Sequence, residues 1–175
     1  MIIKKPLILE DGSFVQAISP VVVSASRCTD IPAFYADCFF HRLQVGYSVW
    51  TNPFNGKKSY VSYDATRFIV FWSKNPLPLL PFLDILRKKN FGCYIQFTLN
   101  DYEDENLEPY VPSLLQHIEI YIELSKCLGK DAVIWRFDPL VLTETLTVEK
   151  LLSKIERITD ACMVSRISWY SAMQI

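Results

Sequence analysis

The 175-residue chain has few glycines and few histidines, and each shortage excludes a class of site. Its five glycines stand far apart, whereas a Walker A loop and a dinucleotide-binding fingerprint both need clustered glycines that let backbone N–H groups approach phosphate. The only two histidines, His41 and His117, form no HExxH motif. A Ser-His-Asp triad would have to use one of these two residues.

The five cysteines form no CxxC pair, so they do not indicate a metal site. Their odd number also does not indicate a set of disulfides. They are Cys28, Cys38, Cys93, Cys127 and Cys162. This usage is typical of reduced thiols, so we predict a cytoplasmic location. The first residues hold no apolar run long enough for a signal peptide. Charges or prolines interrupt the other apolar runs, so the sequence predicts no membrane span.

The composition is that of a folded protein with a substantial core, since 50% of residues are apolar and 14% are aromatic. The net charge of −1 provides no overall basic field for nucleic acid or an acidic membrane, although a local basic cleft stays open and nucleic acid stays undecided. At this length we expect one domain over residues 1–175. It would comprise a hairpin over 1–20, βα units over 21–159 and an atypical tail over 160–175.

Apolar, β-branched segments alternate with longer segments of helical periodicity. Asp11-Gly12 predicts the tight turn of the N-terminal hairpin. Predicted strands cover residues 21–26, 47–51, 59–63, 67–73, 93–99, 132–137 and 164–170, the first of them buried on both faces. Predicted helices cover 31–45, 76–89, 112–128 and 147–159, with Asp30 as the first N-cap and Gly46 ending that helix.

This alternation predicts right-handed βαβ units and a parallel sheet. The expected fold class is α/β, an incomplete TIM-like βα barrel of about five or six parallel strands with an N-terminal β-hairpin. A closed eight-stranded barrel takes about 250 residues, so only part of one fits here. A doubly wound open sheet is the alternative. A partial barrel exposes strand edges, through which the chain could associate with itself.

Polar residues follow four of the predicted strands at the end where parallel α/β folds place their sites. The candidate pocket residues are Ser26, Arg27, Asp30, Lys74, Asn75, Gln96, Thr98, Arg136 and Asp138. An unpaired polar group on a buried strand costs about 1–3 kcal/mol, so their recurrence favours one shared pocket for a small molecule or nucleotide. The pattern assigns no catalytic residue and no metal ligand.

Structural interpretations of the same residues stay open. Arg136 and Asp138 could form an ion pair that only fixes a strand end, and Lys74 could extend along the surface. Gln96 and Thr98 could be satisfied inside the core, and Arg27 could pair with Asp30. The acidic residues between positions 101 and 108 do not have the spacing of an EF-hand, so they predict a solvated loop.

Five longer segments resemble one known family. They are SASRCTDIPAFYADCFFHRLQVGY, NPFNGKKSYVSY, FIVFWSKNPLPLL, YIQFTLNDYE and VIWRFDPLVLT, and in combination they resemble the bacterial DUF1848 family over about residues 21–159. That family is similar to radical S-adenosylmethionine proteins of the spore photoproduct lyase type. Those proteins end one strand with a Thr-Lys pair and another with an Arg-x-Asp-Pro-like motif. Ser73-Lys74 and Arg136-Phe137-Asp138-Pro139 occupy these places.

The resemblance implies a [4Fe–4S] cluster and S-adenosylmethionine in full-length relatives, which carry a Cys-x-x-x-Cys-x-x-Cys motif near the C-terminus. This chain lacks that motif, and residues 160–175 fit the family pattern poorly, so we expect no cofactor in this chain. The expectation is a truncated or frame-shifted member that is catalytically incomplete alone. Two alternatives remain: a binding module for an anionic small molecule or nucleotide, and a metal-independent barrel hydrolase or lyase with Asp138 as base.

Overall fold

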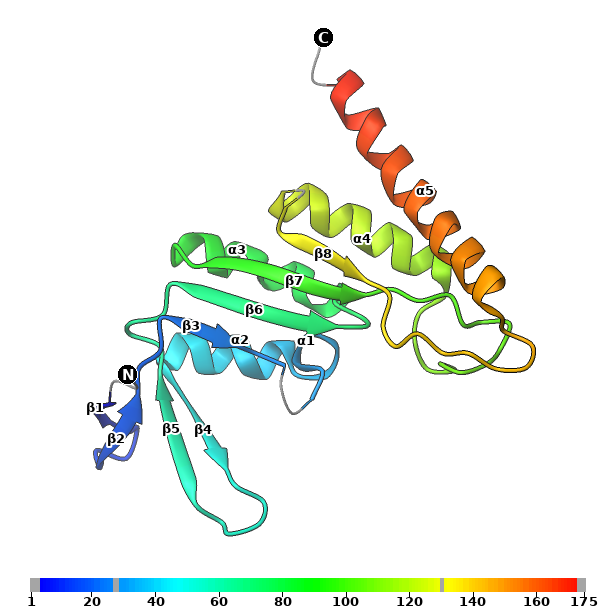
Figure 1. Ribbon diagram of the computed structural model, residues 1–175. Coiled ribbons are helices and arrows are strands. Elements are labelled where there is room, and N and C mark those ends of the chain that lie inside the picture. Colours follow the sequence, from blue (N-terminus) through cyan, green and yellow to red (C-terminus); the bar gives the residue numbers. More distant parts are fainter. Residues whose placement is uncertain (1–3, 27–28, 130, 173–175) are drawn as a thin grey trace.

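The computed structural model describes the backbone of residues 4–26, 29–129 and 131–172. Side chains are described within these ranges as far as Met163. The strands form two four-stranded sheets, one mixed and one wholly parallel (Figure 1). The α/β class predicted from the sequence is therefore confirmed. Arg27 and Cys28 lie outside the described residues, so the predicted pairing of Arg27 is not described.

The mixed sheet has the strand order β1-β2-β5-β4. Strands β1 (Lys4–Ile8) and β2 (Phe14–Ile18) form the predicted hairpin, whose turn contains Gly12 at a φ of 80°. Strands β4 (Tyr47–Thr51) and β5 (Lys58–Ser62) form a second antiparallel hairpin. The predicted strands 47–51 and 59–63 thus pair with each other across a turn and belong to the mixed sheet, outside the parallel βαβ series. A short loop at Asn55-Gly56 allows only an antiparallel return, whereas parallel strands need a long crossover.

The parallel sheet has the strand order β3-β6-β7-β8. Its strands are β3 (Val22–Ser24), β6 (Phe68–Ser73), β7 (Gly92–Thr98) and β8 (Val133–Arg136). The sheet thus has four strands in the described chain, where we expected five or six. Strand β3 is short and lies at an end of the sheet, with Val22 56% exposed, so the prediction that it is buried on both faces is wrong.

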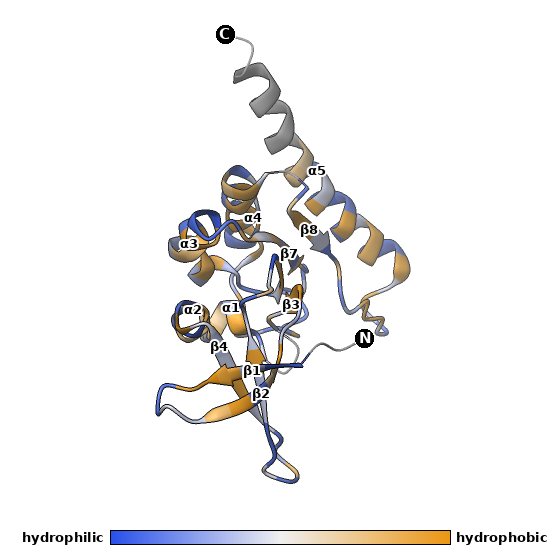
Figure 2. Ribbon diagram, turned by 90° about the vertical axis from the view of Figure 1, so that its left-hand side faces the viewer, coloured by the Kyte–Doolittle hydropathy of each residue, from blue (hydrophilic) through white to orange (hydrophobic). Residues whose placement is uncertain are grey.

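Helices follow the parallel strands and gather on one face of the sheet. Figure 2 shows α2 (Ala36–Val45), α3 (Leu83–Lys88) and α4 (Leu114–Leu128) on the same side of strands β3 and β7. The predicted helix over 31–45 is divided at Tyr35 into α1 (Ile31–Phe34) and α2. Asp30 caps α1 by accepting a hydrogen bond from the Ala33 N–H, and Gly46 ends α2 at a φ of 97°, both as predicted.

Two further helical segments differ from their predicted bounds. The segment predicted at 76–89 begins as a 3₁₀ helix, η1 (Leu77–Phe82), before α3. The last helix, α5 (Val148–Ala172), continues through residues 164–170, so the predicted final strand is wrong. No glycine or proline interrupts residues 148–172, and the intrinsic strand preference of a short apolar run is easily overridden by context.

The main core lies between the parallel sheet and its helices. Ile69 and Phe71 of β6 and Ile95 and Phe97 of β7 are fully buried there, and they alternate with residues on the other face. Phe40 of α2 stacks on Phe82 of η1 with ring centroids 4.9 Å apart. Helix α5 packs against α4 and adds Ile158 and Cys162 to this core. Within the described residues, no helix has the length and apolar character needed to cross a membrane.

Candidate functional site

The face of the parallel sheet opposite the helices carries the polar strand-end residues. Since side chains alternate along a strand, Trp72, Gln96, Thr98 and Arg136 are out of phase with the buried core positions and lie on this open face. The strand register pairs Trp72 with Gln96, and Thr98 with Arg136. Residues from three neighbouring strands therefore meet near the carboxyl ends of the sheet, as the sequence predicts.

Arg136 is the most connected cation on this face. Its Nη1 donates to Gln96 Oε1 at 3.1 Å, and its Nη2 donates to Asp138 Oδ2 at 2.7 Å. Its guanidinium carbon lies 5.2 Å from the centre of the Trp72 ring, which is a cation–π contact. The side chain of Arg136 is 32% exposed and that of Asp138 is 55% exposed. The pair is thus accessible to a ligand, unlike the buried ion pair that the sequence left open.

Lys74 belongs to a second group of contacts at the same end of the sheet. Its Nζ forms a close ion pair with Glu108, which lies in the loop after β7. Asn100, directly beyond β7, donates from Nδ2 to Glu108 Oε1 at 3.2 Å and to Asp138 O at 3.0 Å. Asn100 therefore links the Lys74 contacts to the Arg136 contacts. We call Lys74, Gln96, Asn100, Glu108, Arg136 and Asp138 the strand-end cluster.

The other candidates have local structural roles. Asp30 accepts hydrogen bonds from Ser73 Oγ and the Lys74 N–H, both at 3.0 Å, so it ties the end of β6 to α1. Asn75 Oδ1 accepts from the Leu77 N–H at the start of η1. Ser26 Oγ accepts from the Trp72 N–H at 3.1 Å and donates to the Ala25 carbonyl. These three residues shape the rim of the site, and Thr98 lies beside Arg136 in the register.

Four residues that matter here were not among the sequence candidates. Asn100 continues the period-two spacing of Gln96 and Thr98, so that spacing was a usable signal. Trp72 lies within a predicted strand, and it is 46% exposed on the open face. No sequence pattern pointed to Glu108, because its contact with Lys74 joins residues 34 positions apart. The fourth residue is His117, one of the two histidines in the sequence.

His117 supports the site from the helix layer. The fully buried ring extends from α4, and its Nε2 lies 2.7 Å from the backbone oxygen of Lys74. A carbonyl only accepts, so Nε2 carries the proton and donates it. Burial lowers the pKa of His117, which keeps the ring neutral. Nδ1 has no hydrogen-bond partner among the described residues.

The acidic loop after β7 is exposed over much of its length, as predicted for Glu103 and Asp104, but it is anchored at Asp101, where the prediction of a solvated loop is wrong. Asp101 is only 2% exposed and pairs with Arg157 and Lys154 of α5. Lys154 also contacts Glu105 at 3.1 Å. The Tyr102 hydroxyl donates to Pro139 O at 2.6 Å and accepts from the Val141 N–H at 3.0 Å. Asp101, Asp104 and Glu105 are thus charge partners for α5, which lies far along the chain.

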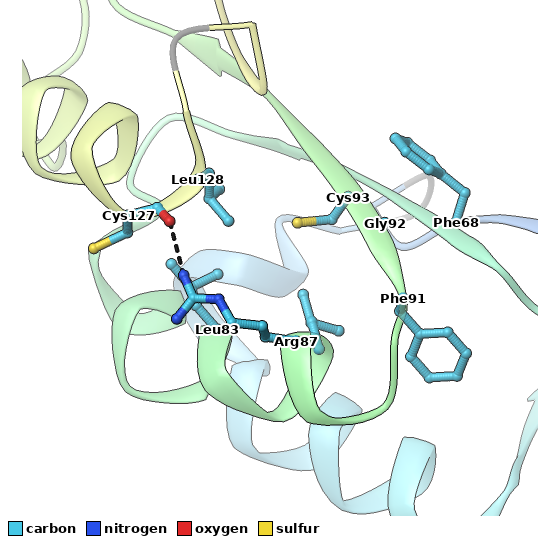
Figure 3. Close-up of a pocket in the computed structure, with 9 residues that line it drawn as sticks. Phe68, Leu83, Arg87, Phe91, Gly92, Cys93, Cys127 and Leu128 are labelled. Carbon is cyan, nitrogen blue, oxygen red and sulfur yellow. Dashed lines mark hydrogen bonds between the residues drawn. The ribbon is translucent and has the colours of Figure 1, made fainter.

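A cavity of about 270 Å³ lies at the opposite, amino-terminal end of β7 (Figure 3). Apolar residues of α3, β7 and α4 line most of it, together with Cys93, Cys127 and Arg87. Burial raises the pKa of the Cys93 thiol to about 11, so this thiol stays protonated at neutral pH. Arg87 donates from Nη2 to the Cys127 carbonyl at 3.0 Å. These groups offer no reactive chemistry, so we place the candidate site at the strand-end cluster.

The thiols in the described part of the chain do not fit an iron–sulfur cluster. Cys38, Cys93, Cys127 and Cys162 lie on four different elements, and within the described residues no three His, Cys, Asp or Glu side chains are close enough to hold a metal ion. A cluster with an open iron needs three converging thiolates. We therefore derive no step through such a cluster.

Comparisons with known proteins identify the chain at the level of its family. Neither the search of curated proteins nor the search of solved structures found a match. The family model described as "Domain of unknown function (DUF1848)" matches residues 22–175. The match extends past residue 159, where we expected the resemblance to end, and it covers most of the chain. The chain therefore belongs to the DUF1848 family.

Proposed function

We propose that the strand-end cluster, together with Trp72, binds an anionic small molecule that carries a flat ring, with nucleotides as the main class. The observation that carries this proposal is the partly exposed Arg136 guanidinium held beside the exposed Trp72 ring on the open face of the sheet. A guanidinium recognises carboxylate and phosphate groups with directed donors. An exposed indole offers a flat apolar surface for a ring.

The arrangement of the donors favours binding over a purely structural role. Gln96 fixes the orientation of Arg136, and the hydrogen bonds to Gln96 and Asp138 use two of the five N–H donors of its guanidinium. A structural ion pair at a strand end would need neither an accessible arginine nor an exposed tryptophan beside it. The location agrees with the rule that ligands of parallel α/β sheets bind at the carboxyl ends of the strands.

We further infer that the parallel sheet is part of a βα barrel. Its strands β3, β6, β7 and β8 are neighbours in chain order, and helices α2, α3 and α4 lie on one face (Figure 2). A doubly wound sheet reverses its strand order and carries helices on both faces. In a barrel the open face would be the interior, so the cluster would lie at the mouth, where barrel enzymes bind substrates.

S-adenosylmethionine is a cation overall and so lies outside the anionic class, but it carries the two groups that the site would recognise, an adenine ring and a carboxylate. The radical chemistry of enzymes of the spore photoproduct lyase type also needs an iron–sulfur cluster. The thiols in the described part of this chain are unsuited to hold one. We therefore propose ligand binding, and not that chemistry, for this chain alone. Asp138 is half-exposed and paired with Arg136, so the hydrolase or lyase alternative has no observation that favours it.

Thermal unfolding with a ligand panel tests the proposal. The panel contains AMP, ATP, NAD and S-adenosylmethionine, each measured by differential scanning fluorimetry and then by calorimetric titration. A ligand at 100 times its Kd stabilises a protein by about 2.7 kcal/mol, which raises the Tm by about 5–10 °C at this chain length. At least one compound should produce such a shift. Arg136→Met and Trp72→Leu should each abolish it.

The matched control is Arg87→Met, at the opposite end of the sheet. Arg87 also pairs with an aspartate, Asp84, and donates to a backbone carbonyl, but it lies outside the strand-end cluster. This variant should keep the full ligand-dependent shift. The proposal fails if no compound shifts the Tm, or if Arg136→Met binds as tightly as the unchanged protein.

A further inference from the structure

We propose that Glu108 is an internal carboxylate that occupies the position of a ligand carboxylate, and that the ligand displaces it on binding. This inference rests on the proposed function and adds to it the ligand group that Lys74 and Asn100 recognise. It starts from the charges of the strand-end cluster, in which Glu108 and Asp138 already pair with both cations. An anionic ligand that pairs with Lys74 must therefore replace Glu108.

Lys74 and Asn100 form a small carboxylate-binding cradle. They follow two neighbouring strands, β6 and β7, and both contact the Glu108 carboxylate. Asn100 Nδ2 lies 3.2 Å from Oε1 and 3.4 Å from Oε2, so one amide spans both carboxylate oxygens. An ammonium and an amide N–H directed at the same carboxylate are donors suited to a planar anion.

The amide of Asn100 is held in its orientation before any ligand arrives. Its Oδ1 accepts from the Asp138 N–H at 3.0 Å, and its Nδ2 donates to the Asp138 carbonyl at 3.0 Å. A rotated amide would lose both bonds, so the second N–H of Nδ2 is directed at Glu108. Asn100 is 5% exposed. The cradle therefore exists independently of the carboxylate that occupies it.

Glu108 belongs to a part of the loop that can move without disturbing the core. Upstream, Asp101 and Glu105 bind α5, and downstream Ser113 begins α4 with a capping box. Between these anchors, the neighbours of Glu108 are exposed, and Tyr110 reaches 98% exposure. Besides the contacts with Lys74 and Asn100, the segment has backbone hydrogen bonds within the loop, donated by the N–H groups of Asn106, Leu107 and Val111. Exchange of Glu108 for a ligand carboxylate would therefore release the segment 106–112.

Chemical rescue of a Glu108→Ala variant tests this inference without the natural ligand. The variant leaves the cradle empty, so acetate or formate should bind there and raise the Tm. Chloride and phosphate are compared at the same ionic strength. If acetate is present at about ten times its Kd, we expect a rise of about 3–5 °C over chloride. The double variant Lys74→Met with Glu108→Ala should not respond to acetate.

Glu105→Ala is the matched control, because it removes another loop carboxylate that pairs with a lysine, Lys154, outside the cradle. Acetate should leave its Tm at the chloride value. If Glu108→Ala does not unfold cooperatively, Glu108→Gln keeps the side-chain length and is titrated in the same way. A smaller rise with acetate is expected there, because the glutamine amide still occupies the cradle.

Three results would overturn the inference: no acetate-dependent rise in either Glu108 variant, an equal rise with phosphate, or an equal rise in the Glu105→Ala control. None of them affects the proposed function. That proposal is tested with ring-bearing ligands and with Arg136 variants in which the loop and Glu108 are unchanged. Conversely, failure of the ligand panel with successful acetate rescue would leave the cradle established and the nucleotide class wrong.

Discussion

The side-chain amide of Asn100 binds both backbone polar groups of Asp138, accepting from its N–H and donating to its carbonyl, each at 3.0 Å. One side chain thereby provides hydrogen-bond partners for the backbone just beyond β8 and joins it to the backbone just beyond β7. A buried polar backbone group without a partner costs free energy, so this contact stabilises the end of the sheet. It also sets the spacing between the Lys74–Glu108 pair and the Arg136–Asp138 pair of the strand-end cluster.

Replacement of Asn100 should therefore be costly. Asn100→Ala removes both bonds and leaves the Asp138 backbone groups unpaired, so we expect a loss of about 2–4 kcal/mol in the free energy of unfolding, measured by urea denaturation. Asn52→Ala is the control, because the Asn52 side chain accepts a hydrogen bond from the Phe54 N–H in an exposed turn. A similar small loss in both variants would contradict the structural importance of Asn100.

The buried carboxylate of Asp101 should hold the acidic loop to α5. Asp101→Asn removes its charge while Arg157 and Lys154 stay in place, and loss of one partner of a buried pair costs up to about 3–5 kcal/mol. Arg157 is largely exposed, so we expect about 1–3 kcal/mol by urea denaturation. Asp84→Asn breaks an exposed pair with Arg87 and should change stability by less than about 0.5 kcal/mol. Equal effects would refute the anchoring role.

Stability should fall in mildly acidic solution because of His117. Burial lowers its pKa in the folded state below the ordinary value of 6.5, so between these two pKa values the unfolded chain binds the proton and the folded chain does not. The stabilisation is complete above about pH 6.5 and is lost as the pH falls below it. Urea denaturation at pH 7.5, 6.5 and 5.5 should show this decline.

Glutamine variants of the two histidines separate this effect from other titrations. His117→Gln should flatten the decline between pH 7.5 and 5.5, whereas His41→Gln should keep it, because His41 is exposed on α2. An unchanged decline in His117→Gln would assign the pH dependence to other groups.

Reconstitution with iron and sulfide tests whether the chain supplies an iron–sulfur site. The thiols at positions 38, 93, 127 and 162 lie on separate elements, so anaerobic incubation should give no stoichiometric cluster by iron analysis and visible absorption. A stoichiometric, stable [4Fe–4S] cluster on this 175-residue chain would refute the prediction.

Much of the parallel sheet could be predicted from the sequence. The segments 67–73, 93–99 and 132–137 are apolar and rich in β-branched or aromatic residues, and they match β6, β7 and β8 closely. Asp30 and Gly46 were predictable helix boundaries because capping depends on local geometry. Polar residues after these strands also indicated one shared edge, since parallel strands end on the same side.

Other features depended on contacts between distant residues. The segment 164–170 has an apolar pattern compatible with either a strand or a helix, and the structure makes it part of α5. Residues 47–51 and 59–63 form strands as predicted, but the sequence did not reveal that β5 also pairs with β2 to make a mixed sheet. Pairing between strands is not encoded in the pattern of one segment alone.

The same division applies to the candidate site. The positions of Lys74, Gln96, Arg136 and Asp138 near strand ends could be predicted from the sequence, because alternation and strand direction are local properties. Packing of distant segments was needed to show that Glu108 reaches Lys74, that Asn100 joins two strand ends, and that Trp72 faces outward. These contacts join residues that the chain brings together only when helices and strands pack, so no local pattern could specify them.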